Sequence, residues 1–244
     1  MKQLPAVMLV CLLSVSFGAG AQQPVTDSAI YRQSVSAARA QYMQQMGANS
    51  FLYNGTAYER YWNGVTGIPF FLQETFQEGT LLYDGTYYES VPLKYDMLRD
   101  EVISLSFDKT IEISLLSSKI SSFTIDGHVF VRLLGDSTAS ASLHTGFYER
   151  IYQGKMRVFH RRESRIERSL NAEDKTVRFK EYHSYFIKKE GNYYLIGSSS
   201  DLQHILKDQR AGIRKILNGR DTNFRKDPAK AIVAAVGYYE QLKK

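Results

Sequence analysis

Cysteine is almost absent from the sequence, and the one residue present, Cys11, lies in an apolar stretch near the amino terminus. Residues 1–21 begin with Met1-Lys2, continue through the apolar run 6–17 and end in Ala19-Gly20-Ala21. This order is typical of a secretory signal peptide. We therefore expect cleavage after Ala21 and a mature chain without cysteine, which can form neither disulfides nor a thiol active site.

Long hydrophobic runs are also lacking beyond residue 17. A resident membrane helix needs about 20 apolar residues, so we expect no transmembrane segment in the mature chain. Because of the predicted signal peptide, we expect the protein to be exported and to be periplasmic or extracellular. Residues 22–244 suffice for one large or two small domains with a proper hydrophobic core.

Recognised catalytic and metal-binding motifs are missing as well. The sequence has no Gly-x-Ser-x-Gly elbow, no phosphate-binding loop, no dinucleotide fingerprint and no His-Glu-x-x-His. Its histidines are scattered, and none has a second ligand at a recognised metal spacing. We therefore predict no catalytic residue, no metal site and no cofactor. The histidines are His128, His144, His160, His183 and His204.

Aromatic residues, in contrast, are plentiful and partly repeated. Residues 51–60 (FLYNGTAYER) return as residues 81–90 (LLYDGTYYES), with six of ten positions identical. Asn-Gly and Asp-Gly favour the type I′ turn, so each copy predicts a β-hairpin. In that register Phe51 faces Tyr58, Tyr53 faces Thr56, Leu81 faces Tyr88 and Tyr83 faces Thr86.

Aromatic rings around these turns can either bind a ligand or pack in the hydrophobic core. A flat ring with a polar tip suits a sugar or a partner surface, whereas cross-strand packing is the alternative use. The candidate ligand-binding residues are Tyr53, Tyr58, Trp62, Tyr83 and Tyr88.

Turn dipeptides divide the middle of the chain into short strands. X-Gly pairs recur between aromatic and β-branched runs, which indicates an antiparallel meander. They are Asn54-Gly55, Asp84-Gly85, Asp126-Gly127, Gln153-Gly154 and Glu190-Gly191.

Helical spacing occurs at both ends of the mature chain. Apolar residues within 27–46 predict an amphipathic helix, and helical periodicity returns from Ser200, with Asp227-Pro228 as the start of the last helix. The predicted fold is therefore α+β: a large twisted antiparallel β-meander, either an open sheet or a half-barrel, with an N-terminal helix and a small C-terminal helical cap. Residues 22–197 form the β domain, and residues 198–244 pack on its sheet.

Charge is distributed unevenly. Residues 22–145 contain 8 Lys/Arg and 13 Asp/Glu, whereas residues 146–244 contain 22 and 12. Either the two halves neutralise each other, or the basic half binds an anionic partner. Residues 157–168 concentrate the cations, and the candidate anion-binding residues there are Arg161, Arg162, Arg165 and Arg168.

Three segments carry a resemblance: residues 83–96 (YDGTYYESVPLKYD), 146–154 (GFYERIYQG) and 224–232 (FRKDPAKAI). Together they resemble a family of exported bacterial envelope proteins of Bacteroidota type whose function is uncharacterised. The resemblance implies export to the envelope. It implies no catalytic residue, because the shared motifs are turn and packing motifs.

These features predict a non-enzymatic exported protein that binds an envelope protein, a lipid or a glycan. Nucleic acid is not expected as a partner. One alternative is a hydrolase, which requires two or more of His128, His144, His160 and His183 to converge in one pocket with a carboxylate. The other alternative is a binder of anionic surfaces or glycans through residues 157–168.

Overall fold

The structure is a computed structural model that describes residues 30–31, 33–35, 37–38, 41, 52, 54–61, 64–135, 143–169, 176–219 and 222–242. Two compact units make up the chain, Met1–Met46 and Gly47–Lys244. In the first unit every described residue, from 30 to 41, is helical, in agreement with the predicted helix. The predicted signal peptide lies outside the described residues. Within these ranges no helix combines the length and hydrophobicity needed to cross a membrane.

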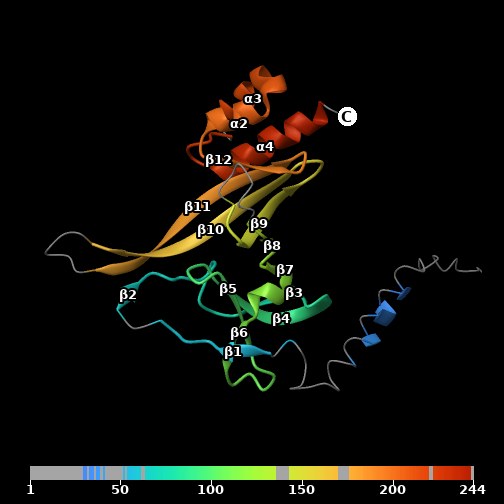
Figure 1. Cartoon of the computed structure of the whole chain (residues 1–244), viewed down its shortest axis with the longest axis vertical. Helices are drawn as coiled ribbons and strands as arrows, with labels where there is room; N and C mark the ends of the chain where they lie inside the picture. Colours follow the sequence, from blue (N-terminus) through green and yellow to red (C-terminus); the bar gives the residue numbers. More distant parts are fainter. Residues whose placement is uncertain are drawn as a thin grey trace, which may run out of the picture. The chain divides into compact units, whose positions relative to one another are not determined.

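The second unit is built on one sheet, in which 12 strands are described (Figure 1). The strand order is β1-β6-β5-β4-β3-β7-β8-β9-β10-β11-β12, and β2 pairs in parallel with β11. The strands are β1 (Gly55–Ala57), β2 (Val65–Thr66), β3 (Gln77–Tyr83), β4 (Thr86–Asp96), β5 (Glu101–Leu105), β6 (Glu112–Leu115), β7 (Ile120–Ile125), β8 (His128–Leu133), β9 (Gly146–Gln153), β10 (Arg157–Arg168), β11 (Val177–Lys189) and β12 (Asn192–Ile196).

The strand order consists of two antiparallel meanders that share β3. Strands β3 to β6 follow one another outward, and the chain then returns through a 3₁₀ turn, η3 (Ser117–Lys119), so that β7 pairs with the other side of β3. From β7 to β12 the strands again follow in sequence. The predicted α+β fold with an open antiparallel sheet is confirmed, although the meander reverses once. Because β8 pairs with β9, the sheet continues across residues 134–145.

The two repeated segments have different structures. Asp84 and Gly85 have φ values of 49° and 75°, and Leu81 pairs with Tyr88, as predicted for the second hairpin. The prediction of a turn at Asn54-Gly55 is wrong: neither residue has a positive φ, and Gly55 begins β1, which pairs with β6. A Cβ on Gly55 would lie 2.3 Å from the carbonyl oxygen of Ser114. Glycine is therefore needed there for the close approach of two strands rather than for a turn.

Three helices cover the end of the sheet formed by β9 to β12 (Figure 1). They are α2 (Ser199–Ile205), α3 (Arg210–Leu217) and α4 (Pro228–Gln241). As predicted, Asp227 caps α4 by accepting a hydrogen bond from the Lys230 amide, and Pro228 occupies the first turn. Apolar residues of the helices and of β10 to β12 share one buried cluster, which includes Val158, Ile187, Leu202, Ile213 and Ile232.

The last four residues of β4, 93–96, are buried on both faces of the strand, and the two faces differ in chemistry. Successive side chains of a strand point to opposite sides. On one side Tyr95 packs among Phe123, Phe130 and Phe147, with ring centroids 5.2–6.0 Å from its own. Lys94 and Asp96 point to the other side, where Lys94 contacts Phe70 and Asp96 contacts Tyr58 and Tyr61. The polar face of β4 carries residues of the candidate functional site.

Candidate functional site

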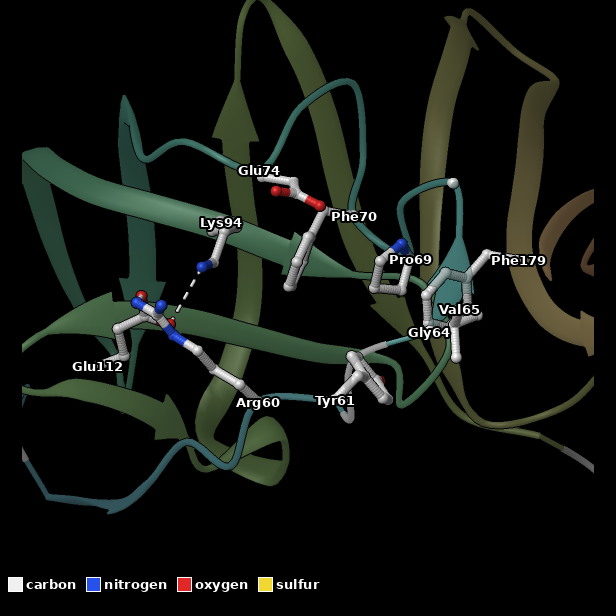
Figure 2. Close-up of a pocket in the computed structure, with 11 residues that line it drawn as sticks. Arg60, Tyr61, Gly64, Val65, Pro69, Phe70, Glu74, Lys94, Glu112 and Phe179 are labelled. Carbon is white, nitrogen blue, oxygen red and sulfur yellow. Dashed lines mark hydrogen bonds and ion pairs between the residues drawn. The ribbon is translucent and has the colours of Figure 1, made fainter. Parts of the chain in front are cut away.

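A pocket of about 330 Å³ lies between β4, β6, β11 and the segment 60–74 (Figure 2). Its lining comes from parts of the chain that are far apart in sequence, from residue 60 to residue 179. Four charged and three aromatic residues dominate it: Arg60, Glu74, Lys94, Glu112, Tyr61, Phe70 and Phe179.

A buried ion pair forms one side of this pocket. The side chain of Lys94 is only 6% exposed, and its Nζ donates to Glu112 Oε2 at 3.1 Å. The ammonium also lies 4.5 Å from the ring centroid of Phe70 and 4.7 Å from that of Phe76, close enough for cation–π attraction. Lys94 is therefore held by a carboxylate and two rings at once.

Glu112 is shared between two cations. Arg60 donates from Nη2 to Glu112 Oε1 at 2.6 Å, on the side opposite the bond from Lys94. Burial alone would raise the pKa of Glu112, but the hydrogen bonds from Lys94 and Arg60 outweigh it and lower this pKa. The carboxylate thus stays ionised at neutral pH.

Asp96 holds the segment that forms another wall of the pocket. This fully buried carboxylate accepts hydrogen bonds from Tyr58 at 2.9 Å and from Tyr61 at 2.6 Å. Its second oxygen accepts from the amides of Leu98 and Arg99. Burial and the charge of Asp96 raise the pKa of the Tyr58 phenol, so that it remains a neutral donor. Residues 58–61 are thereby tied to the end of β4.

A second polar cluster surrounds the buried Glu149 of β9. Its Oε1 lies 2.6 Å from His128 Nδ1, and its Oε2 lies 3.0 Å from Arg162 Nε. His160 Nδ1 lies 3.3 Å from Oε2 without completing a hydrogen bond. The other ring nitrogen of His160, Nε2, lies 3.0 Å from His183 Nδ1. Three histidines thus converge, directly or through one another, on one carboxylate.

The electrostatics of this cluster favour an ionised Glu149 and a neutral His160. Burial raises the pKa of Glu149, but the close contact with His160 and the hydrogen bonds with His128 and Arg162 outweigh it and lower the pKa to about 2. Burial lowers the pKa of His160, and the nearby Glu149 carboxylate opposes this only in part. The side chains of His128 and His183 are 36% and 43% exposed, so both reach solvent.

In the described part of the chain, no group of three or more His, Cys, Asp or Glu residues is arranged so that it could hold a metal ion. No family model, curated protein or solved structure matches the chain. The resemblance to exported envelope proteins therefore stays a prediction.

The aromatic residues singled out from the repeat are buried where the structure describes them. Tyr58, Tyr83 and Tyr88 are each at most 9% exposed, and the Tyr83 hydroxyl donates to the Asn54 carbonyl. They form no exposed aromatic surface, and a ligand-binding role for them stays a prediction. Tyr53 and Trp62 lie outside the described residues.

The four arginines of β10 do not form one cluster. Arg161 and Arg165 lie on one face of the strand, and both contact Glu163. Arg162 lies on the opposite face and pairs with Glu149 and with Glu181 of β11, while Arg168, at the end of β10, is exposed. Three of the four arginines thus pair with carboxylates of the same strand or of a neighbouring strand. Anion binding through the four arginines stays a prediction.

Sequence reasoning missed the residues that build the pocket. Arg60 and Tyr61 lie between two of the predicted aromatic residues, whereas Lys94, Glu112 and Phe179 lie on three different strands. One signal was present: Lys94 and Asp96 lie two residues apart in the otherwise apolar segment 91–96 (VPLKYD). Charged groups in such positions need partners, because an unpaired buried charge is costly.

Proposed function

We propose that this chain is a non-enzymatic exported protein of the cell envelope that binds a small ligand in the pocket between β4, β6, β11 and residues 60–74. The observation that supports this most is the concave site itself, with a volume typical of ligand pockets and a few convergent polar groups among aromatic rings. Asp96 and the Lys94–Glu112 pair hold its walls without any ligand. The site is therefore preformed.

A tryptophan at the pocket is expected to remove bound material. Glu74 is exposed and lines the pocket, whereas its exposed neighbour Gln73 does not, so Glu74→Trp and Gln73→Trp form a matched pair. Mass spectrometry of protein purified from its native host should find a small molecule with the wild type and with Gln73→Trp. We expect Glu74→Trp to lose at least nine-tenths of it. Equal retention in both variants would contradict the proposal.

The histidine cluster supports one alternative function. Three of the four histidines named for a hydrolase converge with Glu149, while the exposed His144 does not. None of them lines the pocket described above. In a hydrolase the carboxylate would orient His160, and the partly exposed His183 would serve as general base.

Two single variants test the hydrolase alternative. If the chain is a hydrolase, His183→Gln should lower turnover of chromogenic esters, phosphates or glycosides by about 100-fold or more. His144→Gln, an exposed control, should leave it unchanged. Absence of turnover in the wild type, or equal rates in the two variants, would exclude the alternative and leave the binding proposal standing.

A further inference from the structure

The charges that line the pocket balance. Arg60 and Lys94 supply two positive charges, and Glu74 and Glu112 supply two negative ones. An ionic ligand would therefore find no net charge of opposite sign in the site. An acyl chain would have to remove water from charged groups without replacing their hydrogen bonds, which is costly. Both observations favour an uncharged ligand that is nevertheless polar.

Donors and acceptors alternate along the charged side of the pocket. Arg60 has five N–H groups, of which one bonds Glu112 at 2.6 Å, and its side chain is 79% exposed. The carboxylate of Glu74 adds acceptors near Phe70 (Figure 2). Hydroxyl groups both donate and accept, so adjacent hydroxyls can satisfy such a mixed lining without carrying charge.

The opposite side of the pocket offers aromatic surface. The rings of Tyr61 and Phe179 lie 5.3 Å apart at an angle of 65°. Figure 2 shows both at the side away from Lys94 and Glu112. A ligand that fits both sides has a ring of hydroxyl groups on one edge and an apolar face on the other.

We infer that the pocket takes an uncharged pyranose sugar, with its hydroxyl groups toward Arg60, Glu74 and the Lys94–Glu112 pair and its C–H face toward Tyr61 and Phe179. This inference rests on the proposed function, because it names the ligand class of the same pocket. It explains why the site combines charge balance with aromatic rings.

Saturation-transfer NMR on the purified protein tests the inference. The probes are methyl glycosides of glucose, galactose, mannose and N-acetylglucosamine, with glucuronate, choline and decanoate as charged and apolar comparisons. We expect at least one uncharged pyranoside to bind, with the strongest transfer to its C–H face. Phe179→Ala should weaken this binding about tenfold, and Phe107→Ala, at an exposed ring outside the pocket, should not.

The outcomes separate the inference from the proposed function. Binding of glucuronate, choline or decanoate in preference to all four pyranosides, lost in Phe179→Ala, overturns the sugar inference and keeps the pocket as a ligand site. Native material that depends on the pocket and contains no sugar does the same. If no probe binds and no native material is lost in Glu74→Trp, both the inference and the proposed function fail.

Discussion

Replacing Asp96 with alanine should lower the free energy of unfolding by about 4 kcal/mol. The substitution leaves the hydroxyls of Tyr58 and Tyr61 and two backbone amides without their acceptor, and each lost bond to a charged group is worth about 1–3 kcal/mol. The same change frees residues 58–61 from β4, so ligand binding should fall with stability. Urea unfolding followed by circular dichroism measures the first effect.

Two control variants make this result specific. Glu89→Ala, at an exposed position of the same strand, should change stability by less than about 0.5 kcal/mol. Tyr61→Phe removes one hydroxyl and keeps the ring, so a loss of about 1–2 kcal/mol is expected. If the free energy of unfolding of Asp96→Ala is within about 1 kcal/mol of the wild-type value, the loss is no larger than that of a single hydrogen bond. The carboxylate would then not hold this wall.

Acid should destabilise the protein through the Glu149 cluster. The pKa of Glu149 is about 2 in the folded chain and 4.5 as its ordinary value. Its contribution, about 3 kcal/mol, is present above pH 4.5 and is lost as the pH falls toward 2. The lowered pKa of His160 acts in the same direction, because the folded state keeps the neutral ring below its ordinary value of 6.5. Stability should therefore decrease from about pH 6.5 downward.

The variant Glu149→Gln tests this assignment. The substitution removes one of the ionic partners of Arg162. The free energy of unfolding at pH 7 should therefore fall by about 3 kcal/mol. Below pH 4.5 the stability of the variant should depend less steeply on pH than that of the wild type. Thermal unfolding between pH 3 and pH 8 measures both slopes, with Glu89→Gln as an exposed control. Parallel curves for wild type and Glu149→Gln would place the acid sensitivity elsewhere.

Local chemistry made part of the fold predictable. Asp84-Gly85, Asp126-Gly127 and Glu190-Gly191 all have positive φ in turns, and this preference is written in the residues themselves. The last helix was equally readable, because Asp227 and Pro228 act within one turn of it. Asn54-Gly55 has the same local signal, yet Gly55 pairs with a strand some 60 residues away. Tertiary pairing there overrides the turn preference.

The candidate site was hidden for the same reason. Its lining joins residues 60–74 to Lys94, Glu112 and Phe179, and no local pattern states which distant strands will meet. The histidines show the same limit: His128, His160 and His183 have no motif spacing, but their positions on β8, β10 and β11 bring them together around Glu149. The pairing register of the strands, rather than the spacing along the sequence, places the three histidines close together.

The parallel pairing of β2 with β11 has a consequence for the order of folding. Val65 and Val177 are partners although more than 100 residues separate them, and contacts of such high sequence separation form slowly. During synthesis or transfer across a membrane, the short strand β2 must wait until nearly three quarters of the chain is available. The wall that Tyr61 and Phe179 share therefore cannot form before β11 is available, so the pocket is assembled late, after most of the sheet.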